Sequence, residues 1–512
     1  MKNLKIEEAW NYHNLTKHSY ESVRSSTHSL DWDNQPLPYK EYVDVRSIPL
    51  SRDFPLLKMP ALEAISTVFT DDSGKSDLSV KDLSNILFHS AGIIRRKSFP
   101  GGISIDFRAA ACAGALYPIE VYVVCGELKG LEAGVYHFSP RDFALKELRR
   151  GDWRGVLVDA TGGEEAVKRA PIILVYTAVT WRSSWKYQNR AYRYHFWDAG
   201  TIVANTLAVS TAYRLPAKVI MGFVDDKVNR LIGVDGKKEK SICLVSIGST
   251  AKEPLPLDMS PLDVRTLPLS AKEIEYPLIQ RIHCFSSLKS EEEVIGWKKG
   301  FYPGSFSNES SGSKENLIQL SEVPDSRLPQ DTVQEVILRR TSTRRFSHKP
   351  VALEVLSSIL YRSTRGIPSD FLEPLGVSLN EIYLIVNAVE GLPSGAFFFH
   401  RERNCLELLK SGLFRRESGY LTLEQRLGRD AAVVVFFLSD LSCVLQRLGN
   451  RGYRAVQLES GILGGKLYLG AHAFNIGATG LTFYDDDITE FFSPHAKGKS
   501  AIFVVALGVP AD

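Results

Sequence analysis

Hydrophobic and polar positions change along the chain between a helical period of about 3.6 residues and a strand period of about two, and the same series of changes occurs twice. Each copy begins with a helical stretch, followed by a β-branched strand, a return strand that starts at a glycine, a buried strand, a long apolar helix and a last strand. In the first copy we predict these elements at 80–91, 121–124, Gly134, 172–176, 192–213 and 242–247. In the second copy we predict them at 352–363, 382–386, Gly395, 433–437, 453–474 and 501–507. Because strands and helices interleave in both copies, the expected class is α+β.

Identical residues recur at a constant spacing between the two copies. Glu120 and Glu381 are 261 residues apart, and the segments "NRAYR" at 189–193 and "NRGYR" at 450–454 keep the same spacing. A self-similarity that extends over most of the chain indicates a duplicated unit. Features that both copies share are expected to serve the fold, and features that only one copy has are better candidates for chemistry.

The length and the low-complexity stretches predict where the domains begin and end. A chain of 512 residues is too long for one ordinary hydrophobic core. We predict an N-terminal extension at 1–80, a first domain at 81–250 and a second domain at 331–512. Residues 251–330 contain the Pro-rich "EPLPLDMSPLDVRTLPLS" and the Ser-rich "GSFSNESSGSKEN", which predict a linker that is partly mobile.

Composition and charge exclude several classes of protein. Lys and Arg total 62 against 59 for Asp and Glu, so a net charge of +3 gives no whole-chain field for a nucleic acid. The six cysteines are scattered without a C-x-x-C pair, which indicates reduced thiols and no metal site. The apolar run at 431–438 is too short to span a bilayer, and the N-terminus lacks a signal-like apolar region. We expect a soluble, cytoplasmic protein with no nucleic-acid or membrane partner.

The first candidate site is the basic segment "LRRTSTRRF" at 338–346. It is compatible with a solvated basic face, a nucleic-acid patch or a cradle for one phosphate, since Arg and Ser/Thr at this spacing can donate several hydrogen bonds to one anion. The first copy offers Asp71 and Asp72 in the corresponding stretch, so this feature exists once.

Two more segments distinguish the first copy from the second. "FRAAACAGALYPIE" at 107–120 is rich in small residues, which allow the backbone to approach a flat ligand closely or simply pack tightly. In "RSSWKYQNRAYRYHFWDAG" at 182–200, Lys186 and Tyr187 align with Arg447 and Leu448, so this acid/base-capable pair is not duplicated. Adjacent residues diverge on a regular helix or strand, so the pair can serve one site only from a loop or a helix start. An aromatic helix cap and a single-strand stacking surface are the alternative interpretations.

Together these segments resemble the FMN-dependent nitroreductase superfamily, and within it the SagB/ThcOx-type branch of azoline (thiazoline/oxazoline) dehydrogenases. "YHNLTKHSY" at 12–20 is similar to the N-terminal signature of that branch, and "CAGALYPIEVYV" to its flavin loop. "WKYQNRAYRY" resembles its Lys-Tyr segment, and "RRTSTRRF" resembles the Arg-x-Ser-x-Arg flavin-phosphate motif of the superfamily. The four motifs occur in the expected order, and the resemblance covers nearly the whole chain.

The resemblance implies two tandem nitroreductase-like sheet-plus-helix domains that form an intrachain pseudo-dimer with FMN between them. Members of the superfamily take the phosphate clamp from one subunit and the small-residue loop from the other. Here the implied FMN-binding residues are Arg340, Ser342 and Arg344 of the second copy, Arg108, Cys112, Ala113, Gly114, Ala115 and Leu116 of the first, and Thr479, Gly480 and Leu481 of "GATGL". Since each part occurs once, we expect one FMN per chain.

The resemblance also implies the chemistry. Lys186 and Tyr187 match the catalytic pair of the branch, which is proposed to handle the substrate proton while hydride passes to flavin N5. The implied substrate is an azoline-type heterocycle in a peptide or small molecule, with a cyclodehydratase as partner. Ala111 and Cys112 depart from the usual Pro-Ser, and Thr201 follows Gly200 where the branch has His. A nitro- or quinone-reductase driven by reduced nicotinamide, and a non-catalytic scaffold of a peptide-modifying complex, are the alternative functions.

Overall fold

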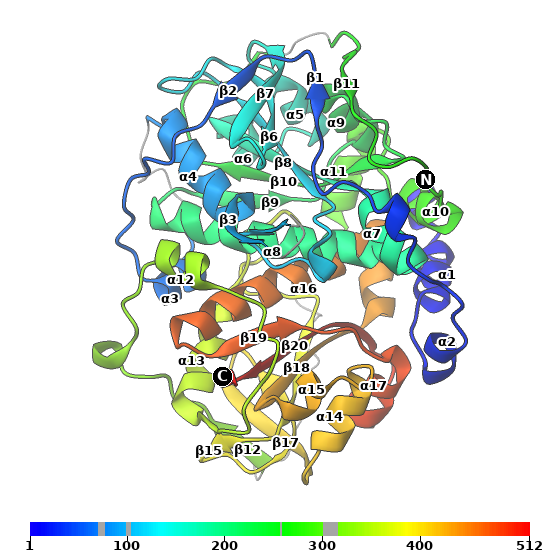
Figure 1. Ribbon diagram of the computed structural model, residues 1–512, viewed down its shortest axis with the longest axis vertical. Coiled ribbons are helices and arrows are strands. Elements are labelled where there is room, and N and C mark those ends of the chain that lie inside the picture. The colour runs from blue at the N-terminus through cyan, green and yellow to red at the C-terminus, as the bar shows by residue number, and fades with distance from the viewer. Residues whose placement is uncertain (70–76, 99–103, 256–258, 301–315, 512) are drawn as a thin grey trace.

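The protein folds into two halves of similar architecture, stacked one above the other in a computed structural model (Figure 1). The structure describes residues 1–69, 77–98, 104–255, 259–300 and 316–511. Asp71 and Asp72, which correspond to the basic segment of the second copy, lie outside these residues. So does most of the Ser-rich part of the predicted mobile linker.

Each half is built on a seven-stranded antiparallel sheet, and the strand order is the same in both. The first sheet has the order β2 (Ser47–Pro49), β7 (Ala144–Arg150), β6 (Gly134–Ser139), β5 (Ile119–Cys125), β8 (Ile172–Val179), β10 (Glu239–Ile247) and β9 (Ala217–Ile220). The second has the order β12 (Leu317–Gln319), β17 (Cys405–Ser411), β16 (Gly395–His400), β14 (Glu381–Val386), β18 (Val433–Ser439), β20 (Ser500–Gly508) and β19 (Gly477–Gly480). Both fit the predicted α+β class, and every strand predicted from periodicity is present within a few residues.

Two small sheets and one hairpin lie outside the main sheets. They are β1 (Tyr42–Val43) with β11 (Arg265–Thr266), β13 (Val351–Ala352) with β15 (Val389–Glu390), and the hairpin of β3 (Ile93–Ser98) and β4 (Ser104–Arg108).

Two long helices lie between the sheets and cross each other (Figure 1). They are α8 (Ala191–Ala212) and α16 (Leu441–Ala473), and both are buried along almost their whole length. They approach closely at Gly200 and Gly461, where a Cβ added to Gly200 would lie 2.6 Å from the backbone of Gly461. Only glycine allows such an approach, and these two glycines are 261 residues apart. The internal pseudo-twofold axis of the duplication therefore passes close to this crossing.

The remaining helices cover the sheets and fill the space between the halves. On the first half these are α4 (Val80–Ala91), α5 (Arg154–Ala160), α6 (Glu165–Arg169), α7 (Thr180–Tyr187) and α9 (Asp225–Ile232). On the second they are α13 (Leu353–Ser363), α14 (Arg415–Leu421), α15 (Arg426–Asp430) and α17 (Asp485–Phe492). The predicted extension and linker contribute α1 (Glu7–Leu15), α2 (Tyr20–Arg24), α3 (Ala61–Ser66), α10 (Pro277–Phe285) and α11 (Glu291–Lys299), and α12 (Val333–Arg339) opens the second predicted domain. The helices predicted at 80–91 and 352–363 are confirmed to within one residue.

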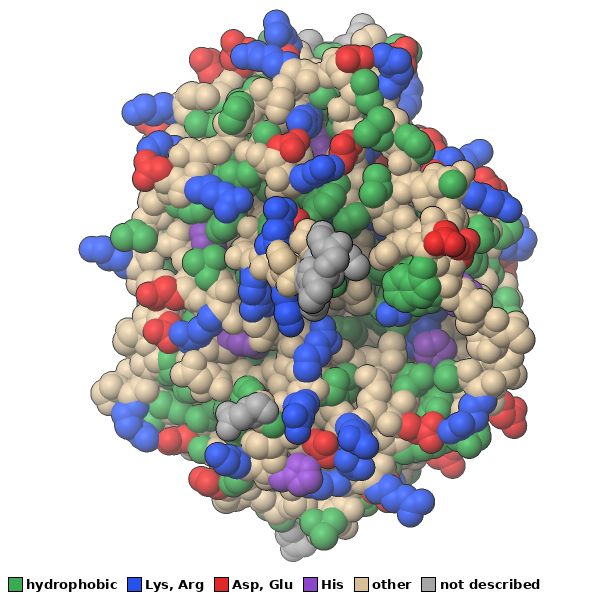
Figure 2. Space-filling model, viewed as in Figure 1, with side chains coloured by type: hydrophobic (Ala, Val, Ile, Leu, Met, Phe, Trp, Pro, Cys, Tyr) green, Lys and Arg blue, Asp and Glu red, His purple; other side chains and the backbone are tan. Residues whose placement is uncertain are grey.

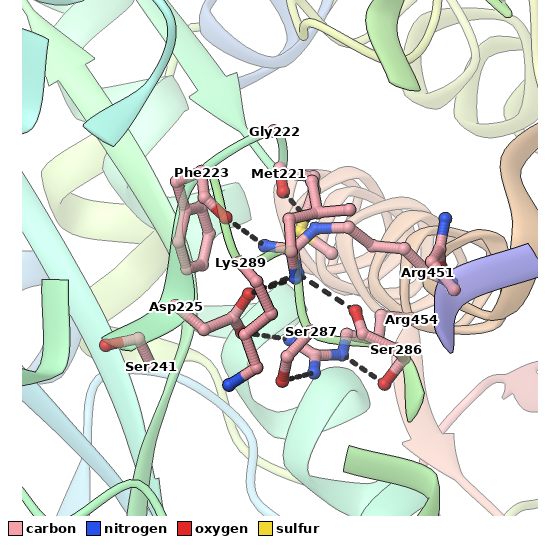
Figure 3. A network of polar contacts seen from close by, with 12 residues as sticks. Met221, Gly222, Phe223, Asp225, Ser241, Ser286, Ser287, Lys289, Arg451 and Arg454 are labelled. Carbon is pink, nitrogen blue, oxygen red and sulfur yellow. Dashed lines mark hydrogen bonds and ion pairs between the residues drawn. The ribbon is translucent and has the colours of Figure 1, made fainter. Parts of the chain in front are cut away.

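A buried ion-pair network joins α16 to the first half (Figure 3). Arg451 and Arg454 each donate a 2.7 Å hydrogen bond to the carboxylate of Asp225, the first residue of α9. Burial alone would raise the pKa of Asp225, but the two guanidinium groups outweigh it and hold that pKa below its usual value. A buried charge is tolerated only when it is paired in this way.

The same network occurs a second time in the opposite direction. Arg190 and Arg193 of the first half donate to the carboxylate of Asp485 in α17, at 2.8 and 2.6 Å. The repeated sequence N-R-x-Y-R therefore places two arginines of each half on one aspartate of the other half. This contact explains why the segment is present in both copies.

Segments from the predicted extension and the predicted linker complete the two networks in the same manner. The backbone oxygen of His13 in α1 accepts a 2.8 Å hydrogen bond from Arg193, and the backbone oxygen of His283 in α10 accepts one of the same length from Arg454. The duplication thus includes α1 and α10, which lie outside the two predicted domains.

Candidate functional site

The basic segment at 338–346 lies where the two halves meet. Arg340 follows α12, is only 6% exposed, and donates from Nε to the backbone oxygen of Ala109 at 2.9 Å and from Nη2 to that of Arg108 at 3.1 Å. Burial lowers the pKa of its guanidinium group. Arg344, by contrast, is exposed. Arg340 therefore belongs to an interface between the halves, and not to a solvated basic face.

The other predicted residues of the second half surround this arginine. Ser342 forms a parallel bridge with Ala478 of β19, and the backbone N–H of Thr343 donates to the oxygen of Ala478 at 3.0 Å. Tyr468 of α16 connects both segments, since its hydroxyl lies 3.3 Å from Ser342 Oγ and accepts a 2.7 Å hydrogen bond from the N–H of Gly480. The structure thus brings Arg340, Ser342 and the "GATGL" segment together.

The small-residue loop of the first half ends at the same interface. After β4 the chain passes through a single turn at Ala113–Ala115, where Gly114 has φ 63°. Gly114 is exposed, and Ala113 and Ala115 are half-buried. A surface of alanine and glycine presents backbone with little side-chain bulk, as a flat ligand requires.

A buried carboxylate holds this loop in place. Asp198 of α8 accepts from the N–H of Ala113 at 2.9 Å and from the thiol of Cys112 at 3.3 Å. Burial raises the pKa of Asp198 to about 7, although both hydrogen bonds act in the opposite direction. Burial and the Asp198 charge raise the pKa of the Cys112 thiol well above its usual value, so Cys112 is a hydrogen-bonding residue here and not a reactive thiolate.

Lys186 and Tyr187 approach the loop from α7. They are its last two residues, and the helix ends because Gln188 has φ 48°. The expectation that the pair lies in a loop or at the start of a helix is therefore wrong. The pair lies at the end of a helix. A Cβ on Gly114 would lie 2.8 Å from Tyr187 Oη and 3.5 Å from Lys186 Nζ, so both polar groups meet the loop at one glycine.

The two side chains differ in environment. Lys186 is exposed, whereas the ring of Tyr187 stacks on Tyr194 with centroids 4.1 Å apart and an interplanar angle of 9°. Burial raises the pKa of Tyr187 well above its usual value, and the neighbouring Tyr194 and Asp198 raise it further. The phenol is therefore protonated at neutral pH and can donate a hydrogen bond.

Arg108 has an observed role that differs from the predicted one. Its guanidinium group is buried and donates to the backbone oxygens of Pro38 at 2.6 Å and Ile119 at 3.4 Å. These contacts fix the start of the loop. Contact between Arg108 and an anion remains a prediction.

Sequence reasoning missed three residues that organise the site. Asp198, Tyr194 and Tyr468 all lie on the two central helices, in segments that are buried almost without interruption. Asp198 falls inside the 182–200 segment that the copy comparison selected, so an acidic residue within an apolar helix was the available signal. Exposed basic side chains also gather near the site, over the β3–β4 hairpin (Figure 2).

Comparison with known proteins identifies the first half. Residues 79–249 match the model of the Nitroreductase family. This part of the chain is therefore similar to nitroreductase-family domains. MJ1384 of Methanocaldococcus jannaschii, assigned as a nitroreductase, is 26% identical over 173 residues, which cover 34% of this chain and 82% of that protein.

Two further relatives have names that refer to processing. The microcin B17-processing protein McbC of Escherichia coli is 26% identical over 31% of this chain and 58% of its own length. The trifolitoxin-processing protein TfxB of Rhizobium leguminosarum bv. trifolii is 28% identical over 33% of this chain and 42% of its own length. The matched region thus spans only about half the length of these two relatives.

One solved structure matches both halves. A crystal structure assigned as a nitroreductase, from Anabaena variabilis ATCC 29413, is 26% identical with a TM-score of 0.79 and covers 98% of this chain and 99% of that chain. The tandem arrangement of two nitroreductase-like domains is therefore shared along the full length of both chains.

The described ranges contain neither a metal cluster nor a membrane-spanning helix. Within the described ranges, no group of three or more His, Cys, Asp or Glu side chains could hold a metal ion. Among the helices of these ranges, none is both long enough and apolar enough to cross a membrane.

Proposed function

We propose that the chain is an FMN-dependent oxidoreductase of the SagB/ThcOx dehydrogenase type, with one FMN bound between its halves. The observation that carries the proposal is the buried Arg340 of one half in contact with the start of the small-residue loop of the other. The nitroreductase-family domain supports an oxidoreductase, since members of that family are oxidoreductases.

The residues present fit FMN. Arg340 uses two of its five N–H donors on backbone oxygens, so others remain for a phosphate, and Ser342 and the exposed Arg344 follow at alternate positions. The loop offers Cys112, Ala113, Gly114, Ala115 and Leu116, and β19 leads into Thr479, Gly480 and Leu481. In this proposal the guanidinium groups bind the phosphate, and the two small-residue segments lie against the flavin ring.

When bound, FMN supplies the redox chemistry by accepting two electrons as a hydride at N5. Lys186 and Tyr187 then handle the proton. The exposed Lys186 Nζ lies next to the loop at Gly114 and is the group proposed, in its neutral form, to take the substrate proton. Tyr187 Oη, which its buried environment keeps protonated, donates a hydrogen bond that orients the substrate.

The proposed substrate is an azoline-type heterocycle in a peptide or small molecule. The support comes from McbC and TfxB, whose names refer to the processing of microcin B17 and trifolitoxin. A cyclodehydratase, which makes azolines, is the partner that such a substrate requires. Incubation of the flavin-loaded chain with an azoline peptide should give a product lighter by two hydrogens and a bleached flavin under anaerobic conditions. A flavin that stays oxidised with every azoline tested would contradict this substrate class.

A nicotinamide-driven nitro- or quinone-reductase is the second candidate, because the match to MJ1384 covers most of that protein. Rapid anaerobic bleaching by NADH or NADPH would favour it. Purified chain without any flavin absorbance, even after incubation with FMN, would favour a scaffold over both enzymes.

The stoichiometry tests the site itself. Because the arginine clamp and the small-residue loop each occur once, we expect one FMN per chain from flavin absorbance and protein mass. A ratio near two would show that the pseudosymmetric position also binds flavin and would contradict the divided site.

A further inference from the structure

The position related to the candidate site by the pseudo-twofold axis holds a cavity of about 480 Å³. It lies between the end of α6, β9 and a segment of the second half at 368–375. This volume falls in the range of about 300 to 1,000 Å³ that small-molecule sites occupy. Its walls include Val68, Phe69, Leu372 and Leu375, together with the charged side chains of Arg169 and Lys218.

Backbone pairing shows how this cavity corresponds to the candidate site. The N–H of Ala61 donates to the oxygen of Asp331, and the N–H of Val333 donates to the oxygen of Met59. Met59 and Asp331 are 272 residues apart, and so are Ala61 and Val333. The pseudo-twofold axis therefore relates the two bonds, and α3 is equivalent to α12. Counted from them, Val68 occupies the position of Arg340. The arginine of the clamp is thus replaced by an apolar side chain.

A different cation reaches this position from α16. A smaller cavity of about 10 Å³ shares Val68, Phe69, Ala217 and Pro368 with the larger one, and Lys466 lies in the wall of the smaller cavity and not in that of the larger one. Lys466 is 4% exposed, and Nζ donates to the backbone oxygen of Gly366 at 2.8 Å. No carboxylate pairs with it among the residues that the structure describes.

A buried ammonium with two free donors needs an anionic partner. Burial lowers the pKa of Lys466 to about 8, which is the response of a cation that lacks a counter-ion. In the first half Asn205 is the equivalent residue, 261 positions earlier, so this lysine is not part of what the two copies share. Desolvation of an unpaired charge is unfavourable, and an anionic ligand would remove that penalty.

The surroundings select the type of anion. Lys218 at the rim is already paired with Glu164 and Glu373, each at 3.0 Å, so it adds no uncompensated positive charge. Arg169 in the same wall lies 3.9 Å from the carboxylate of Glu165. The one remaining cation, Lys466, and the rim carboxylates disfavour a dianionic phosphate, which arginine clusters bind better. The apolar side chains of Phe69, Leu372 and Leu375 match a hydrocarbon or aromatic body.

We propose that this pseudosymmetric cavity is a second ligand site, which binds a small monocarboxylate with its apolar body between Phe69 and the leucines and its carboxylate directed toward Lys466 at the adjoining smaller cavity. The site lacks the arginine clamp, so its ligand differs in class from FMN. The proposal is independent of the reaction at the candidate site.

Calorimetric titration of the full, flavin-loaded chain with a series from phenylacetate to 5-phenylpentanoate, and with the matching amides, tests the proposal. We expect at least one acid to bind with a Kd below about 1 mM and about tenfold or more tighter than its amide, as a charge-assisted hydrogen bond requires. The preference should shrink as pH rises through about 8, because Lys466 then loses its proton. Equal binding of acid and amide, or no saturable binding of any acid, would overturn the proposal.

Variants separate this site from the flavin site. Lys466→Met should abolish the preference for acid over amide, whereas the surface control Lys497→Met should keep it. If Lys466→Met fails to fold, Leu375→Trp, at a side chain that is 48% exposed, should narrow the mouth and weaken acid and amide alike. Flavin content should be unchanged in each folded variant; retained acid preference in Lys466→Met would refute the role of this lysine.

One competing occupant lies within the chain. Asp71 and Asp72 follow Phe69 in the sequence but lie outside the described residues. The double variant Asp71→Asn/Asp72→Asn should bind the acids with unchanged affinity. Acid binding that appears only in this variant would mean that the chain supplies its own carboxylate to Lys466, and the proposal of an external ligand would then be wrong.

Discussion

The two ends of the interface between the halves have a related backbone and different chemistry. At one end Arg340 extends across to the small-residue loop, and Lys186 and Tyr187 meet that loop at Gly114. At the other end Val68 stands in the place of Arg340, and the cation is Lys466 from α16. Duplication therefore supplied two similar interfaces, and substitution of a few side chains gave each interface its own candidate ligand.

The features that did not diverge are those that hold the halves together. Two arginines of each half pair with one aspartate of the other, in networks that match atom for atom. A buried charge that loses its partner is strongly unfavourable, so neither network tolerates change. The residues that differ between the two ends are those proposed to bind ligands, and the residues that are alike in both halves hold the halves together.

The largest expected effect is at the groups that exist once. Tyr187→Phe and Lys186→Met should each lower turnover by about 10²-fold or more, the size of effect typical of a proton-transfer group. FMN content should not change. The control is Arg447→Met, the equivalent of Lys186 in the second half, which should retain full turnover. Undiminished turnover in both site variants would remove Lys186 and Tyr187 from the proposed mechanism.

Disruption of one of the two ion-pair networks that the halves share should lower stability and leave turnover unchanged. Asp225→Ala leaves Arg451 and Arg454 buried without a carboxylate and should lower the free energy of unfolding by about 3–5 kcal/mol. Asp485→Ala should have a similar effect, since its network is equivalent. Urea denaturation measures both. The exposed neighbour Asp226, which pairs with Lys289, gives the control Asp226→Ala with a change of at most about 1 kcal/mol. A mild effect at Asp225 would contradict the structural role of the networks.

Loss of Arg340 should weaken FMN binding, whereas a change at the equivalent position of the other end should not. Arg340→Ala removes a charge-assisted donor and should weaken FMN binding by about 10- to 100-fold. Fluorescence titration of the flavin-free chain with FMN measures this. Val68→Ala, at the equivalent position of the other end, should leave the FMN affinity unchanged. If the two variants behave alike, the assignment of FMN to the Arg340 end is wrong.

A pH-dependent effect is expected at Asp198. Its pKa is raised to about 7 in the folded chain from about 3.9 in an unfolded one, so the protonated carboxyl stabilises the fold at low pH and this contribution is lost as pH rises toward 7. The acid faces the Cys112 thiol, the Ala113 N–H and the rings of Tyr187 and Tyr194.

Asp198→Asn removes that titration. The difference in unfolding free energy between the variant and the native chain should therefore change by up to about 1.4 kcal/mol per pH unit between pH 4 and 7, with the variant gaining relative to the native chain as pH rises. Urea denaturation at several pH values measures it. A difference that is independent of pH would mean that Asp198 is ionised throughout this range.

Much of the fold follows from local pattern. The helices at α4 and α13 and the strands of both sheets lie where periodicity predicts them, because burial on one face imposes a period that the sequence displays. Comparison of the copies also selected Arg340, the small-residue loop and the Lys186–Tyr187 pair. α16 consists of two helical segments that meet at Gly449, where φ is 63°, and the helix predicted at 453–474 corresponds to the second of them.

The sequence by itself determined the duplication, the element order and which candidate groups exist once. Only the tertiary structure decided that Arg340 contacts Arg108 and Ala109, that Asp198 holds the loop, and that Lys466 is buried without a carboxylate among the described residues. These contacts join residues about 85 to 230 positions apart. Periodicity reports which face of an element is buried, but partners on another element depend on how the two halves dock, and that is set by packing at the Gly200–Gly461 crossing.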